Sequence, residues 1–121
     1  MALHIEISSH TAATRTPLPK IAGELEHVLG QRLTAVIAGI SDAKAVSKWA
    51  SGARSPRPDT EQRLRDAYYV TTLLSQAESP ATIRAWFSGM NPELDDRSPA
   101  LALAEDAPRV LQAARTFLAH G

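Results

Sequence analysis

A short segment in the middle of the chain holds side chains that could bind nucleic acid. Its basic and hydroxyl candidates are Lys44, Ser47, Lys48, Arg54 and Arg57. Because residues 43–58 contain no acid, this segment has a local charge of +4, whereas the whole chain has a formal net charge of +0. Lysine and arginine neutralise phosphates whatever the sequence, and Ser47 and Lys48 are expected to reach base edges. Any affinity for DNA must therefore come from this local patch.

The residues on either side of the patch predict a helix-turn-helix. Residues 31–38 are expected to form its first helix, and Gly39 can adopt the positive φ of the turn. Ser41 or Asp42 is expected to cap the second helix, which Trp49 would anchor in the core. The second helix of such a motif lies in the major groove of DNA. Proteins of this kind bind as dimers, so we also expect a homodimer.

The rest of the chain shows mainly helical patterns. Apolar residues make up 44% of the sequence, and β-branched residues are sparse after the first forty positions, which favours helices. In the pairs Ser79-Pro80 and Ser98-Pro99, Ser can cap a helix and Pro fits its first position. Helices are expected at 17–30, 59–76 and 106–119, and after Ser79-Pro80 and Ser98-Pro99. The expected fold class is all-α: a helix-turn-helix bundle followed by a small helical C-terminal part.

Residues 2–8 differ from this pattern because apolar and polar residues alternate. Leu3, Ile5 and Ile7 would lie on one face of a short β-strand. A lone strand is not stable, so it would have to pair, for example with a second copy of the protein. A frayed tail is the alternative. Residues 1–16 are therefore expected to form an N-terminal strand and linker.

Several functional classes are not expected. The chain contains no cysteine, and its four histidines lack the spacing of a metal site. No Ser/His/Asp arrangement or phosphate-binding loop is present, and Asp95-Asp96 suits a turn better than acid–base catalysis. We therefore expect no enzymatic activity, no metal and no cofactor. No apolar run approaches the roughly 18 residues of a membrane span, and a signal pattern is absent, so a cytoplasmic protein is expected.

The second half of the chain carries a series of short motifs. They are Ile83-Arg84-Ala85-Trp86-Phe87, Asn91-Pro92-Glu93-Leu94, Arg97-Ser98-Pro99-Ala100-Leu101-Ala102-Leu103 and Arg109-Val110-Leu111. This progression resembles the toxin-binding domain of the Xre/MbcA/ParS antitoxins, in which W-L/F, N-P-x-L, P-x-x-L and R-V-L motifs follow an Xre-type helix-turn-helix. The resemblance covers residues 19–119. The glycine pair usual in the family's loop is replaced here by Asp95-Asp96.

This resemblance implies a type II antitoxin. Such proteins bind a RES-domain toxin that consumes NAD⁺ and block its active-site cleft, and many also bind their own operator. It implies a DNA-binding domain at 17–77 and a toxin-binding domain at 78–121. The toxin-facing candidates carried over are Asn91, Pro92, Leu94, Arg97, Pro99, Phe117, His120 and Gly121.

Two functional hypotheses follow. The first is an antitoxin that binds a RES-type protein toxin and represses its own operon by binding operator double-stranded DNA. The second is a stand-alone transcriptional regulator, such as a phage or host repressor, that kept the fold without a toxin partner. A neighbouring gene for a RES-type toxin would favour the first hypothesis.

Overall fold

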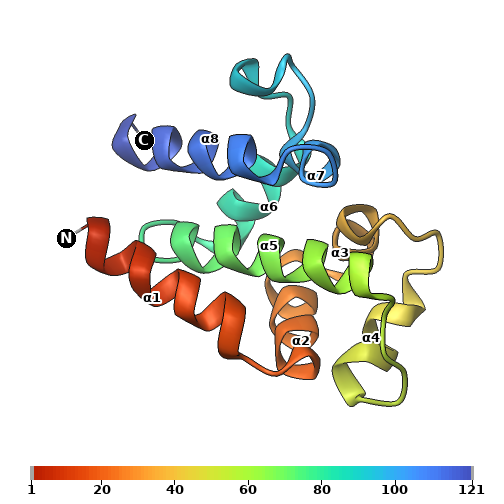
Figure 1. The fold of residues 1–121 in the computed structure, drawn as a ribbon. Helices are drawn as coiled ribbons and strands as arrows, with labels where there is room; N and C mark the ends of the chain where they lie inside the picture. Colours follow the sequence, from red (N-terminus) through yellow and green to blue (C-terminus); the bar gives the residue numbers. More distant parts are fainter. Residues whose placement is uncertain (1, 121) are drawn as a thin grey trace.

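The computed structural model of the chain describes residues 2–120, and the side chains from Glu6 to His120. Within residues 2–120 the fold is all-α, as predicted, and has no β-strand (Figure 1). The α-helices are α1 (Ala2–Arg15), α2 (Leu18–Leu29), α3 (Gln31–Ala38), α4 (Lys44–Ser51), α5 (Pro58–Leu74), α6 (Pro80–Ser88), α7 (Pro99–Ala102) and α8 (Ala107–His120). A short 3₁₀-helix, η1 (Pro92–Leu94), lies in the loop between α6 and α7.

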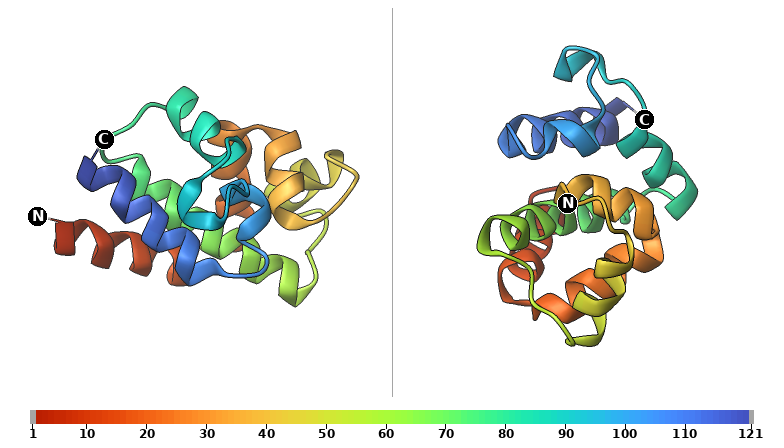
Figure 2. Two further views of the ribbon diagram at one scale, coloured as in Figure 1. Left: turned by 90° about the horizontal axis from the view of Figure 1, so that it is seen from above. Right: turned by 90° about the vertical axis from the view of Figure 1, so that its right-hand side faces the viewer.

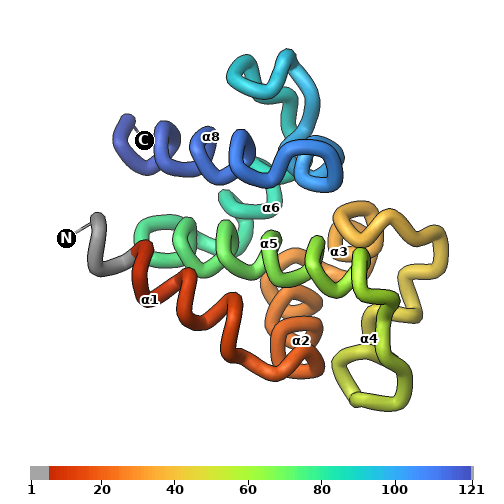
Figure 3. Tube along the Cα trace, in the orientation of Figure 1, coloured from red at the N-terminus to blue at the C-terminus, as the bar shows by residue number. Residues whose placement is uncertain are grey.

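Helix α5 is the centre of the fold. It contacts α1, α2 and α3 from the N-terminal side and α8 from the end of the chain. The backbone trace in Figure 3 shows α8 returning to cover α5 after the excursion through α6 and α7. In the right-hand view of Figure 2, the C-terminal helices (blue) lie above α5 (green), and the N-terminal helices (red and orange) lie beside and below it. Helix α5 therefore connects the two halves of the chain, because helices of both halves pack against it.

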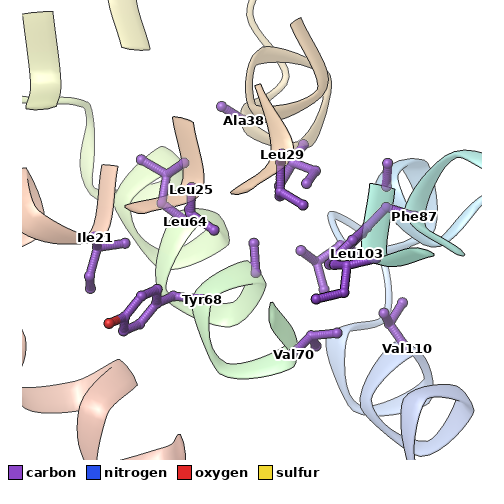
Figure 4. Close-up of a cluster of buried hydrophobic side chains, with 14 of the residues drawn as sticks. Ile21, Leu25, Leu29, Ala38, Leu64, Tyr68, Val70, Phe87, Leu103 and Val110 are labelled. Atoms are coloured by element: carbon purple, nitrogen blue, oxygen red, sulfur yellow. The ribbon is translucent and has the colours of Figure 1, made fainter. Parts of the chain in front are cut away.

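One hydrophobic core contains residues from both halves. Leu64 and Tyr68 of α5 face Ile21 of α2, while Val70 lies near Val110 of α8 (Figure 4). The buried residues of α6 and α7 belong to the same cluster. The segments 17–77 and 78–121, assigned to different tasks from the sequence, thus share their buried apolar surface.

The prediction of an N-terminal strand and linker was wrong, because Ala2–Arg15 forms helix α1. Contacts with α5 explain the difference. Ser9 and Ala13 are buried, and Arg65 of α5 donates through Nη1 to the carbonyl oxygens of Ala13 and Thr16 at 3.1 and 2.9 Å. Tertiary contacts of this kind override a short alternating pattern. Ile7, expected on a paired strand face, is 57% exposed.

Ser79-Pro80 and Ser98-Pro99 start helices as predicted. Ser79 Oγ accepts a hydrogen bond from the Thr82 N–H at 3.3 Å, and Ser98 Oγ accepts one from the Leu101 N–H at 3.3 Å. Helix α5 begins at Pro58, one residue before the expected start at 59; Arg57 is its N-cap, and no side chain caps it. Local capping signals therefore located the C-terminal helices well.

In the described part of the chain, no helix combines the length and the apolar character needed to cross a bilayer.

Tyr68 provides a pH-dependent element of the core. Its hydroxyl donates to the Glu24 carboxylate of α2. Burial, helped by this hydrogen bond and the carboxylate charge, raises the pKa of Tyr68 from 10.0 to about 12. The neutral phenol is thus favoured in the folded state, so its contribution to stability is complete below pH 10.0 and is lost as the pH rises through about 12.

We therefore expect Tyr68→Phe to change the alkaline stability profile. At neutral pH the variant should lose about 1 kcal/mol of unfolding free energy, because the hydrogen bond to Glu24 is gone. Above pH 10.0 its stability should fall less steeply than that of the wild type, because one raised pKa has been removed. Urea unfolding at a series of pH values measures both effects. Identical alkaline slopes for the two proteins would contradict the assignment.

Candidate functional site

A tight glycine turn separates α3 from α4. Gly39 has φ 76° and ends α3. Its N–H bonds to the Val36 carbonyl at 3.1 Å, and the Ile40 N–H bonds to the Ala35 carbonyl at 3.0 Å. This pair of bonds is a Schellman motif, which satisfies carbonyls at the end of a helix. The turn directs the chain into α4, which packs against both α3 and α2.

Helix α4 has one buried side and one exposed side. Val46 and Trp49 are buried, 0% and 4% exposed, whereas Lys44 and Lys48 are exposed. The helix begins at Lys44, whose N–H donates to Asp42 Oδ1 at 3.0 Å. Of the two capping candidates, Asp42 therefore makes the bond, although Ala43 occupies the N-cap position. The sequence interpretation of this helix, with an aromatic anchor and outward lysines, agrees with the structure.

The segment after α4 adds two exposed arginines. Gly52, with φ 80°, ends α4, and the Arg54 N–H returns to the Lys48 carbonyl at 3.2 Å. Arg54 and Arg57 are both exposed. Arg57 Nε lies 4.0 Å from Asp59 Oδ1, a pair whose side chains are 88% and 66% exposed, so solvent screens it strongly. The basic residues of the predicted patch are thus displayed on α4 and the loop that follows it.

Ser47 is placed differently from the sequence expectation. It is half-buried, and its hydroxyl donates to the Glu26 carboxylate of α2 while accepting from the Gln31 amide of α3. Gln31 Nε2 also donates to Glu26 Oε2 at 2.8 Å. The hydrogen bonds from Ser47 and then Gln31 hold the pKa of the Glu26 carboxyl below its ordinary value. The Ser47 hydroxyl, expected to read base edges, is therefore engaged within the protein.

Sequence reasoning missed Glu26 and Gln31 as supports for α4. Glu26 is 21 positions before Ser47. A polar residue facing outward on an amphipathic helix gives no sign of so distant a partner. The network joins α2, α3 and α4 through side chains alone, so it fixes the orientation of α4 relative to the helices behind it.

The loop between α6 and α7 is closed on itself. An isolated β-bridge pairs Asn91 with Arg97, with the Asn91 N–H donating to the Arg97 carbonyl at 3.2 Å. Asn91 Oδ1 accepts from the Glu93 N–H at 3.0 Å. Asp95 and Asp96 have φ 58° and 64°, in the left-handed region that aspartate tolerates better than most residues. The loop takes the form of a compact turn, as the Asp95-Asp96 pair suggested.

Side chains fasten this loop to α8 and its neighbours. Arg109 donates to both carboxylate oxygens of Asp95, at 3.0 and 3.3 Å, and this contact holds the pKa of Asp95 below its ordinary value. Arg97 Nη1 lies 2.6 Å from Glu105 Oε2. Planar two-point contacts of arginine with carboxylate add geometric specificity. The loop backbone is therefore held in one position relative to α8.

The toxin-facing candidates occupy different environments. Leu94, 2% exposed, and Pro99 are buried, so they anchor the loop to the rest of the protein and are not available at the surface. Phe117 is half-buried and packs against Trp86 with ring centroids 6.4 Å apart. The surface set comprises the half-buried Asn91 and the exposed Pro92, Arg97 and His120. Gly121 lies outside the described residues.

Among the described side chains, Glu6–His120, no group of three or more His, Asp or Glu side chains could hold a metal ion. Phe87 is fully buried in the hydrophobic core, and the partly buried Trp86 packs against it from the side. Comparison of the chain with protein-family models, with curated proteins and with solved structures finds no match.

Substitution of three glycines in and around the helix-turn-helix segment by alanine should change the stability of the protein to different extents. At Gly39 an added Cβ would meet Arg63 Nη1, and φ is positive, so Gly39→Ala should destabilise the protein most. At Gly52 φ is also positive but nothing lies within 4 Å, so Gly52→Ala should cost only the left-handed penalty of about 1–2 kcal/mol. Gly23 lies within α2, and a Cβ there would meet Ala50 at 3.8 Å, an ordinary contact.

Gly23→Ala is the matched control, and it should stabilise the protein by up to about 1 kcal/mol because alanine favours a helix. Thermal and urea unfolding of the three variants tests the order. Equal losses of stability at positions 39 and 52 would show that the Arg63 side chain simply moves aside.

Proposed function

We propose that this protein is a type II antitoxin that represses its own operon through α4 and binds a RES-domain toxin through its C-terminal half. The observation that carries the DNA-binding part is the two-sided character of α4. Its apolar side is fixed in the core, and Lys44 and Lys48 project from the other side beside an acid-free loop. The toxin-binding part rests on the motif resemblance of residues 83–111.

The dimensions of α4 suit a recognition helix. Its 8 residues span about 12 Å, close to the width of the major groove of B-DNA. Lys44 and Lys48 are four residues apart and so lie on the same side of the helix. Lys48 can donate to guanine acceptors, and the arginines of the following loop can neutralise phosphates. The network of Glu26, Gln31 and Ser47 would keep the helix in register with a duplex.

A single short helix reads only a few base pairs, so the proposal includes a homodimer. Two copies of α4 would enter successive major grooves about 34 Å apart, on operator half-sites related by two-fold symmetry. The net charge of +0 helps to keep binding local, because affinity comes from the patch and not from the general charge of the protein.

For the toxin, the fixed shape of the loop at residues 91–97 supports the proposal. A loop that is already closed by hydrogen bonds and tied to α8 through Arg109 loses little conformational entropy on binding. Arg97 and Pro92 are exposed on it, and His120 is exposed near the end of α8. In this proposal these groups cover the toxin's cleft and exclude NAD⁺.

The DNA-binding part predicts that Lys44→Ala/Lys48→Ala weakens binding to an operator fragment. The slope of log affinity against log salt should fall by about one for each phosphate that the variant no longer neutralises. Arg15→Gln is a suitable control, because Arg15 is an exposed base on α1, a helix that lies apart from α4 in Figures 1 and 2. Fluorescence anisotropy over a range of salt concentrations measures both quantities. Wild-type affinity in the double variant would rule out this face.

The toxin-binding part predicts that removal of residues 119–121 frees toxin activity while leaving DNA binding intact. The cut follows Leu118, whose side chain packs against the core, so the fold should survive. NAD⁺ consumption by a co-expressed RES-type toxin is the readout, and DNA affinity of the same variant is the control. Full protection of NAD⁺ by the shortened chain would show that residues 119–121 do not block the toxin's cleft. Inhibition would then come from the loop at residues 91–97. A protein that binds DNA but never retains the toxin would instead be a stand-alone regulator.

A further inference from the structure

A cavity of about 430 Å³ lies beside the turn that leads into α4. Its walls come from the turn itself, from Trp49 of α4, from the loop holding Arg54 and Arg57, and from Thr60 near the start of α5. Ser41 and Ser55 add two hydroxyl groups. The cavity is thus lined by arginines and hydroxyls that come from separate segments of the chain.

Trp49 is one of the residues that line this cavity, and its indole N–H has no hydrogen-bond acceptor among the described residues. The residue is 4% exposed, and its Nε1 atom is buried. A buried donor without an acceptor costs about 1–3 kcal/mol, and such groups are rare in folded proteins. Indole can only donate, so whatever satisfies it must bring an acceptor atom. The unmet donor therefore points to a ligand with accepting oxygens.

The charge of the cavity favours an anion. Its two arginines outnumber its one acid, Asp42. Asp42 Oδ1 already accepts the Lys44 N–H at 3.0 Å, which occupies part of its capacity as an acceptor. The neighbouring Asp59 neutralises Arg57 only weakly, because that pair is 4.0 Å apart and exposed. Guanidinium groups suit tetrahedral oxyanions because their donors form a planar fork.

We propose that this cavity binds a phosphate group, with Arg54 and Arg57 supplying charge and Trp49 donating its indole N–H. Hydroxyls such as that of Thr60 complete the donor set. The Trp49 nitrogen is covered by neighbouring atoms, so binding requires a small movement of the cavity wall that lets a phosphate oxygen reach it. If the phosphate is one of the DNA backbone, the inference rests on the proposed function. A free phosphate has the same chemistry and does not depend on it.

Arg54 and Arg57 lie on the loop that follows α4 and its lysines. If α4 lies in the major groove, a phosphate of the adjacent DNA backbone is the source that fits the proposed function. The site would then anchor the turn before α4 to the duplex. Contacts with phosphates fix register and orientation, while base contacts specify sequence. This cavity would therefore position α4 without selecting a sequence.

The experiment observes the indole N–H signal of Trp49 by ¹H–¹⁵N NMR. The chain has 2 tryptophans, so the Trp86→Phe variant leaves Trp49 as the one indole signal. The variant is titrated with a short DNA duplex and, separately, with inorganic phosphate at constant ionic strength. We expect a saturable downfield shift as the indole acquires an acceptor. Arg54→Gln/Arg57→Gln in the same background should abolish the shift, and Arg15→Gln should leave it unchanged.

Trp49→Phe provides a second readout in the otherwise wild-type protein. Removal of one hydrogen bond to a charged acceptor should weaken ligand binding about tenfold. Since the net charge stays the same, the salt dependence of DNA binding should not change, whereas Arg57→Gln should lower the slope by about 0.9. This difference separates the indole contribution from a general decrease in positive charge. Unchanged affinity in a folded Trp49→Phe protein would overturn the role of the indole.

The two titrations distinguish the sources of phosphate. A shift with DNA but not with inorganic phosphate assigns the site to the DNA backbone, and a saturable shift with inorganic phosphate assigns it to a free phosphate ligand. No shift with either overturns the inference, even if the Lys44→Ala/Lys48→Ala variant fails to bind its operator. Conversely, a phosphate-dependent shift in a protein that binds no DNA would support the site and reject operator binding. A shift that persists in the double arginine variant would also overturn the site.

Discussion

Burial of α5 on several sides is the constraint on which the rest of the structure depends. Its Leu64 and Leu74 are completely buried, and it contacts helices from both ends of the chain. Arg65, on the same helix, holds the end of α1 by two backbone carbonyls and pairs with Glu61 at 3.0 Å. With α5 in place, α2 and α3 have a surface to pack on, and α4 is in turn supported by α2 and α3.

The proposed DNA-facing and toxin-facing surfaces are built on the same principle, although their residues differ. In each, an apolar anchor is buried and a polar network behind it sets the orientation. Trp49 anchors α4, and the contacts of Glu26 orient it. Leu94 anchors the C-terminal loop, and the two-point contact of Arg109 with Asp95 orients it. Exposed bases then project from a backbone that is already fixed, which lowers the entropy cost of binding.

The sequence was sufficient for several local signals. The Ser79 and Ser98 caps lie three residues from the N–H groups they bind, and Gly39 takes the positive φ expected of it. Distant contacts were not readable. The partner of Ser47 lies on another helix, and α1 is helical because α5 offers it a docking surface, which residues 2–8 could not reveal. The candidate surface bases were therefore identified more reliably than the residues that support them.

The shared core means that the two halves are not exchangeable modules. A fragment ending near residue 77 would open to water the faces of Val70 and Leu74, which share the core with Phe87 and Val110. Each buried side chain of that size contributes about 1.5–3 kcal/mol, a large fraction of the stability of a small domain. Loops and exposed bases of either half can therefore be changed separately, whereas a change of side-chain volume at the junction affects the stability of both halves. Recombination between related genes would be tolerated only where it keeps that junction together.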